Sequence, residues 1–162
     1  MPKTPLAIEV IKGPTRRYRS ILHRADGVEV ELDGGSYNHL GRREVPHDIA
    51  HLIVEDELGL DGGVWGVLAA GGLFRGAAVK SGRQKPHAAR RGREIVAAST
   101  ASLNHAEGLV RTVCDLAGAR RPSEAAVARA IERLGAAADD WARLAPGGVL
   151  RFTWRGAGQR RH

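Results

Sequence analysis

The stretch at residues 27–32, GVEVEL, decides the fold class because apolar and acidic side chains alternate along it. Successive side chains of a β-strand point to opposite faces, so this period of two predicts a half-buried strand. Residues 6–10 (LAIEV) alternate in the same way, and residues 16–23 (RRYRSILH) follow the pattern less well. We expect Val28, Val30 and Leu32 to face the core and Glu29, Glu31 and Asp33 to face water.

Turn signals separate these segments and predict how they pair. Gly13-Pro14 follows the first candidate strand, and Asp26-Gly27, a typical hairpin dipeptide, precedes the last one. The three segments therefore predict an antiparallel meander over residues 5–33. Residues 149–154 (VLRFTW) predict one further strand, which we expect to pair with this N-terminal sheet.

Four helices are predicted between residues 46 and 145. Residues 46–58 form the first, with Pro46 at its first position, Asp48 in its first turn and Gly59 as its stop. Residues 63–74 predict a short helix or a buried, turn-rich segment. Residues 93–117 and 123–145 predict long helices, the second capped by Ser123, and their short connection makes them an antiparallel hairpin.

These elements predict one α+β domain over residues 1–154, with about four strands packed on about four helices. Residues 75–92 lack periodicity and contain three glycines and a proline, so we expect a mobile basic loop there. The tail at residues 155–162 is expected to be disordered.

Composition narrows the class of protein. A chain of 162 residues, 43% hydrophobic and 27% charged, is ordinary for a globular domain. Its single cysteine, Cys114, excludes an internal disulfide and a zinc site built from cysteine alone. The sequence shows no signal peptide and no apolar run near the roughly 18 residues of a membrane span. We therefore expect a cytoplasmic protein without a membrane partner.

One motif has the pattern of a metal site. In His47-Asp48-Ile-Ala-His51 the two imidazoles lie four residues apart, on one face of the first helix, and Glu55 continues the row. This spacing resembles the His-Glu-x-x-His helix of zinc peptidases, in which a carboxylate between the histidines acts as general base. By that resemblance Asp48 is the candidate catalytic base, although its side chain is one methylene shorter than that of glutamate.

The motif predicts a binding site for zinc or another divalent transition metal, with hydrolysis as the candidate reaction. A catalytic zinc takes a third protein ligand and keeps an open position. Glu55, His105, Glu107 or His39 could supply that ligand. Imidazole also binds iron, nickel and copper, so the motif does not select the metal.

Two other interpretations of the same residues stay open. In the structural one, Asp48 caps the helix and His51 hydrogen-bonds a backbone carbonyl. The other is similar to the HD-type phosphohydrolases, for which His23, His47-Asp48 and Asp115 stand in a comparable order. That family is all-helical, whereas His23 falls in a predicted strand.

The segment 45–74 resembles a signature in uncharacterised bacterial proteins. Its elements are Pro-His-Asp-x-x-His-x-x-Val-Glu, then Leu-Gly-Leu, Gly-x-Trp-Gly and a run of small residues ending in Phe74. The resemblance implies no activity. It does imply that the histidine helix and the Trp65 segment form one unit, with Trp65 in the core.

A basic segment supplies the alternative function. The net charge is +7, and residues 75–93 contain seven cations and no acid. Such a segment can bind nucleic acid or an acidic partner, including a second copy of the chain in a homodimer, although no aromatic residue is present for base stacking. The candidate contact residues are Lys80, Arg83, Lys85, Arg90, Arg91 and Arg93.

Overall fold

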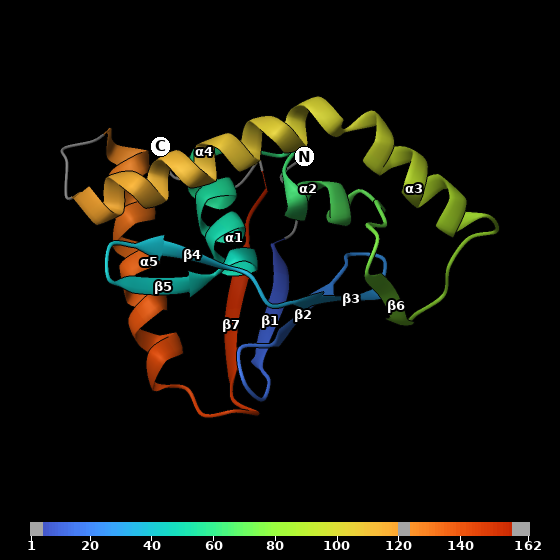
Figure 1. Ribbon diagram of the computed structural model, residues 1–162. Helices are drawn as coiled ribbons and strands as arrows, with labels where there is room; N and C mark the ends of the chain where they lie inside the picture. Colours follow the sequence, from blue (N-terminus) through green and yellow to red (C-terminus); the bar gives the residue numbers. More distant parts are fainter. Residues whose placement is uncertain (1–4, 120–123, 157–162) are drawn as a thin grey trace.

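Alternating side chains in the N-terminal strands build the central sheet. The computed structural model describes residues 5–119 and 124–156, and these show the predicted α+β class (Figure 1). The sheet is antiparallel throughout, with strand order β6-β3-β2-β1-β7. Its strands are β1 (Leu6–Lys12), β2 (Tyr18–His23), β3 (Glu29–Gly34), β6 (Ala77–Ser81) and β7 (Val149–Trp154).

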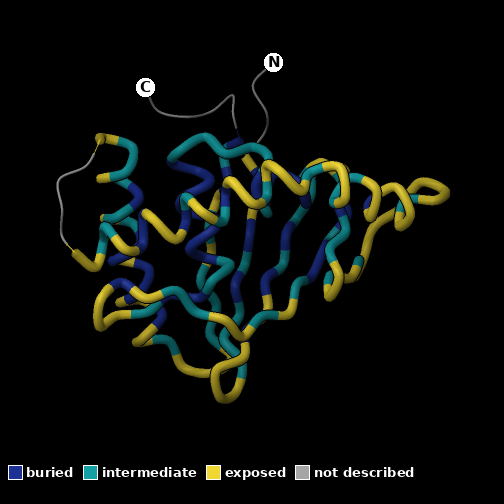
Figure 2. Tube along the Cα trace, turned by 45° about the horizontal axis from the view of Figure 1, so that its top comes forward, coloured by how far each residue is buried: buried dark blue, intermediate teal, exposed yellow. Residues whose placement is uncertain are grey.

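The predicted meander and its C-terminal partner are both confirmed. β1 pairs with β2, β2 with β3, and β7 lies on the other side of β1 with Phe152 opposite Ile8. The inward positions behave as alternation requires, because Ile8, Val28 and Val30 are at most 1% exposed. Figure 2 shows these central strands largely buried.

Glu31 departs from the expected pattern. It is only 9% exposed instead of facing water, and Leu32 on the opposite face is only partly buried. Arg19 on β2 and Lys80 on β6 pair with the Glu31 carboxylate at 3.3 and 3.2 Å. The long side chains of these cations cover the glutamate, an effect that alternation within one strand does not predict.

The expected loop over residues 75–92 contains regular structure. Residues 77–81 form β6, which pairs with β3 at the edge of the sheet, and α3 (Ala88–Ala98) begins inside the segment. An edge strand is held by backbone hydrogen bonds and needs no apolar face, so its composition resembles that of a loop. In Figure 2 this end of the molecule is largely exposed.

A second, two-stranded sheet was not predicted. β4 (Tyr37–Leu40) and β5 (Arg43–Pro46) form an antiparallel hairpin in which Asn38 lies opposite Val45. Strands of four residues are too short to show a period, which explains the omission. The hairpin packs against α4 and α5, and β5 leads directly into α1 (Figure 1).

The described helices number five rather than about four. They are α1 (His47–Leu58), α2 (Val64–Ala69), α3, α4 (Thr100–Ala119) and α5 (Ala125–Arg143). The predicted 93–117 helix is divided at Ser99, so its N-terminal part belongs to α3. Pro46 is the N-cap of α1 rather than its first helical residue, and Gly59 ends that helix in the left-handed conformation as expected. Ser123 and residues 157–162 lie outside the described ranges.

The first helix is buried almost all round. Every residue from Ile49 to Glu57 is buried, including three consecutive acids, Glu55, Asp56 and Glu57. α4 and α5 pack against this helix, and α4 crosses over it in Figure 1. A buried carboxylate costs several kcal/mol unless it is paired, so each of these acids needs a partner.

Arginines from distant parts of the chain pair with two of these acids. Asp56 contacts Arg133 of α5 and Arg155 after β7, both at 2.8 Å, and also accepts the Arg155 backbone N–H at 2.9 Å. Glu57 contacts Arg129, Arg133 and Arg155 within 3.1 Å. Burial raises the pKa of Asp56, but the hydrogen bonds from Arg155 and Arg133 outweigh it and hold that pKa below its usual value.

We predict that Asp56→Asn lowers the free energy of unfolding by about 3 kcal/mol, because it removes one of the two buried carboxylates that neutralise Arg133 and Arg155 and leaves only Glu57. The folded-state pKa of Asp56 is depressed, so its contribution is complete above the ordinary carboxyl range near pH 4. It is lost as the pH falls through that depressed folded-state pKa. Urea unfolding between pH 7 and pH 3 measures both effects.

Asp139→Asn is the matched control. Asp139 is half exposed and pairs with Arg43 at 3.3 Å on the surface, so its loss is expected to change the free energy of unfolding by less than about 1 kcal/mol. Equal losses in the two variants would contradict the structural importance of the Asp56 network.

Candidate metal site

Two histidines of α1 and one glutamate of α4 converge on a single point. His51 Nε2 lies 2.7 Å from Glu107 Oε2, and His47 Nε2 lies 3.4 Å from the same oxygen. The histidines share a helix face because they are four residues apart, and their ring centroids are separated by 4.5 Å. One ligand atom from each of the three residues lies within 4.8 Å of the others, close enough to hold one metal ion.

Hydrogen bonds on the far side of both rings direct Nε2 toward Glu107. His47 Nδ1 lies 2.7 Å from Asn38 Oδ1, and His51 Nδ1 lies 2.7 Å from Glu55 Oε2. An acceptor at Nδ1 places the proton there and leaves the Nε2 lone pair for a metal. Metal-binding histidines are commonly oriented by such an acceptor.

The carboxylate of Glu55 is itself fixed by the start of α2. Its two oxygens accept the backbone N–H groups of Val64 at 2.9 Å and Trp65 at 3.0 Å. Glycine at position 63 makes room for this contact, because a Cβ there would collide with the Glu55 carboxylate. The Trp65 indole N–H donates to the Asp48 carbonyl at 3.1 Å, so α1 and α2 are joined at both ends of the motif.

The site runs from the core to the surface. The side chain of His51 is 2% exposed, that of His47 31% and that of Glu107 43%. A metal held by these three residues would therefore have protein on the His51 side and solvent on the Glu107 side. A further coordination position of such a metal would therefore face solvent.

The charges of the cluster favour a bound cation. Burial lowers the pKa of His51, but hydrogen bonds and charge from Glu55 and Glu107 outweigh it, so that pKa is raised. Burial and the neighbouring His51 lower the pKa of His47. Burial raises the pKa of Glu107, but the two histidines outweigh it and lower the net value. The His51 ring lies between the Glu55 and Glu107 carboxylates, so a metal at Nε2 would replace the hydrogen bond between His51 and Glu107.

Several predicted site residues lie elsewhere. Among the described residues the converging group excludes Glu55, which orients His51 instead, and the exposed His105 and His39. Asp48 is not in the group either, since its carboxylate accepts a hydrogen bond from Ser20 at 2.9 Å. Within residues 5–119 and 124–156, no side-chain hydrogen bond caps α1 and the partners of both His51 ring nitrogens are carboxylates, so neither contact of the structural interpretation is found there.

The residues that stand in the order of the HD-type phosphohydrolases do not form one site. His23 lies in the sheet and contacts Glu9 at 2.7 Å and Glu29 at 3.3 Å. Asp115 is exposed on α4, and neither residue belongs to the converging group within the described part of the chain. Cys114 is buried, which raises the pKa of its thiol to about 12, consistent with a packing role.

Sequence patterns missed two residues that orient the site. Asn38 lies on the unpredicted β4–β5 hairpin, and no motif connects it with the histidines. Gly63 belongs to the Gly-x-Trp-Gly run, but the need for glycine at this position follows from a contact with Glu55 that the sequence does not reveal. Glu107 is one of the four candidates for the third ligand. It lies beside the two histidines because α4 crosses over α1.

The predicted cationic residues divide into two groups. Lys80 pairs with Glu31, Arg90 approaches Glu94 at 3.9 Å, and Arg93 is exposed on α3. The remaining three line a common cavity beside α3, and they are Arg83, Lys85 and Arg91.

The chain matches no protein-family model, no curated protein and no solved structure. Within the described ranges, no helix has the length and apolar character needed to cross a membrane.

We predict that Gly63→Ala lowers the free energy of unfolding by about 1–3 kcal/mol. The added Cβ displaces the Glu55 carboxylate from the Val64 and Trp65 amides and leaves it buried with fewer partners. Thermal or urea unfolding measures the loss.

Gly108→Ala is the matched control, because no described atom outside its chain neighbours and the adjacent backbone of α4 lies within 4 Å of the added Cβ. Replacement of glycine by alanine inside a helix is expected to stabilise the protein by about 0.5–1 kcal/mol. A Gly63→Ala protein as stable as the parent would contradict the tight fit at Glu55.

Proposed function

We propose that the protein binds one divalent transition metal, with zinc as the favoured candidate, through His47, His51 and Glu107. The observation that carries this proposal is the convergence of both Nε2 atoms on Glu107 Oε2 while both Nδ1 atoms are engaged on the opposite side. Two imidazoles and one carboxylate form a common catalytic zinc set.

The distances are compatible with a small tetrahedral ion. Metal–ligand bonds of about 2.0–2.1 Å place neighbouring ligand atoms about 3.3 Å apart. The distance of 3.4 Å between His47 Nε2 and Glu107 Oε2 agrees with this value. The distance of 2.7 Å from His51 Nε2 is that of a hydrogen bond, so the Glu107 carboxylate must move by about half an ångström when the metal replaces the proton.

The proposed chemistry is hydrolysis by a metal-bound water. Three protein ligands would leave a coordination position open, and the exposure of Glu107 and His47 supports a position that faces solvent. Zinc in such a site lowers the pKa of its water to about 7 and can polarise a carbonyl or phosphoryl oxygen. The Glu55–His51 hydrogen bond supports this chemistry by making the imidazole a better ligand.

We predict that protein purified without a histidine tag binds one zinc ion per chain. Free zinc at about 100 times its Kd is expected to raise Tm by about 5–10 °C. Glu107→Gln removes a charged ligand from a half-exposed position, so it should fold and bind zinc more than about 100-fold more weakly. Isothermal titration calorimetry and elemental analysis measure binding.

Two substitutions elsewhere in α4, the helix of Glu107, serve as controls. Asp115→Asn removes an equal charge, and His105→Ala removes an exposed imidazole, yet neither residue belongs to the converging group. Both are expected to bind zinc like the parent. If the parent neither holds metal nor gains stability from zinc, the cluster is an ionic clamp between α1 and α4 with a proton on His51.

We also predict that zinc affinity rises with pH. Metal must displace a proton from His51, whose pKa is raised above the usual 6.5, so protons compete with zinc at and below neutral pH. Above the raised pKa the competition disappears and affinity levels off. Calorimetry in buffers of different ionisation enthalpy should show release of about one proton at pH 6, below the usual histidine pKa of 6.5, and no release there would contradict this assignment.

A further inference from the structure

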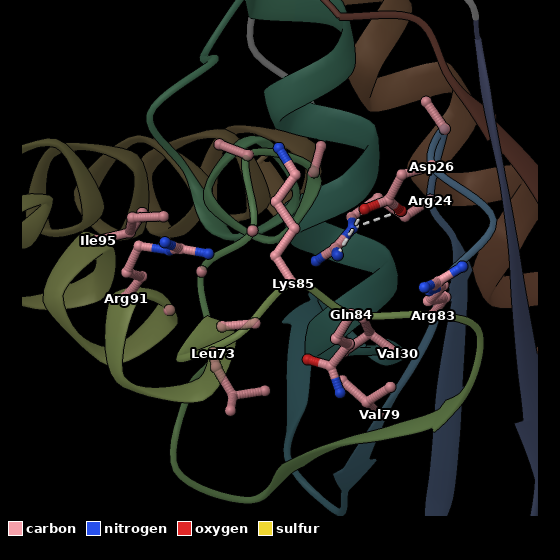
Figure 3. A pocket seen from close by; sticks show the side chains of 17 residues that line it. Arg24, Asp26, Val30, Leu73, Val79, Arg83, Gln84, Lys85, Arg91 and Ile95 are labelled. Atoms are coloured by element: carbon pink, nitrogen blue, oxygen red, sulfur yellow. Dashed lines mark hydrogen bonds and ion pairs between the residues drawn. The ribbon is translucent and has the colours of Figure 1, made fainter.

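A cationic cavity lies at the opposite end of the sheet from β7. It has a volume of about 400 Å³, within the range of small-molecule sites, and shares no residue with the metal cluster. Its walls come from the β2–β3 turn, β3, the end of α2 and the segment after it, β6, the β6–α3 loop, and α3 (Figure 3). This cavity therefore assembles parts of the basic segment that are separated in sequence.

The charge of the cavity is strongly unbalanced. Four cations line it, Arg24, Arg83, Lys85 and Arg91, against the single carboxylate of Asp26. Within the described residues, no acid forms an ion pair with Arg83, Lys85 or Arg91, whereas Lys80 and Arg90 outside the cavity do have acidic partners. The cavity consequently attracts an anion that the folded chain does not supply.

One of these cations is held in a fixed position. Asp26 binds the Arg24 Nε and Nη2 atoms at 2.8 and 2.7 Å, and the Arg24 side chain is only 14% exposed. Nη1 lies on the side of Gly71, which also lines the cavity. Figure 3 shows Arg24 and Lys85 directed into the same space, with Arg91 beside them on α3.

Apart from Gln84, the side chains of the remaining lining residues are apolar or absent. Val30 is 1% exposed, and Val79, Leu73 and Ile95 extend the apolar wall. Gly92 allows α3 to approach, since a Cβ there would lie 2.8 Å from Leu73 Cβ. An apolar wall beside a cluster of cations suits a ligand with a carbon skeleton and a terminal anionic group.

We propose that this cavity binds the phosphoryl group of a small organic phosphate. Arginine donors match phosphate oxygens in paired geometry, and lysine adds a mobile point charge. The lining has no aromatic residue on which successive bases of a nucleic-acid strand could stack, which favours a small phosphate ester over a strand. This site is independent of the proposed metal centre.

The test uses AMP, inorganic phosphate and adenosine as probes in calorimetry with the full-length chain. AMP is expected to bind with one site per chain, inorganic phosphate more weakly, and adenosine without measurable heat. Arg91→Gln should weaken AMP binding by about tenfold or more, the loss expected for a charge-assisted hydrogen bond. Arg93→Gln removes the same charge from an exposed position of α3 outside the lining and should leave AMP affinity within about twofold.

Three outcomes would overturn the proposal. One is failure of both AMP and inorganic phosphate to bind at millimolar concentration in low salt. Another is an equal effect of Arg91→Gln and Arg93→Gln. The last is tight binding of a single-stranded dodecanucleotide that both variants weaken alike, because this would indicate a dispersed nucleic-acid surface. Zinc binding and Tm are measured in the same variants, so a folding defect is recognised separately.

Discussion

Burial of the acidic helix α1 is the constraint on which the rest of the structure depends. Its core face follows ordinary apolar packing, but Glu55, Asp56 and Glu57 are buried with it and must each be compensated. Arg133 of α5 and Arg155 beyond β7 compensate two of them, which ties the C-terminal half of the chain to α1. One electrostatic requirement therefore fixes the position of helix and strand together.

The same requirement builds the candidate metal site. Glu55 is compensated by backbone amides of α2 and by His51, so the ring of His51 is locked before any ligand arrives. Glu107 of α4 then contacts the Nε2 atoms of His51 and His47. A preorganised set of ligands costs little to assemble, and this is why the cluster supports a metal proposal better than the motif alone.

The periodicity of the sequence predicted the larger helices and strands. It did not predict features that depend on contacts with neighbouring segments. The strands around Ile8 and Val30 were predicted because a period of two is a local property of the backbone. β4, β5 and β6 were missed because short or edge strands depend on hydrogen bonds from another strand. In the same way, Glu31 was expected in water, but cations of two adjacent strands cover it.

The sequence alone determined the α+β class, the N-terminal meander and the pair of histidines on one face of α1, because these follow from periodicities of two and 3.6 residues. Tertiary structure decided which residue joins the two histidines, since Glu107 reaches them only through the crossing of α4 over α1. The tertiary structure also brings part of the basic segment 75–93 together with Arg24, and these residues line one cavity. Convergence of side chains from distant segments is a property of packing, which no local pattern encodes.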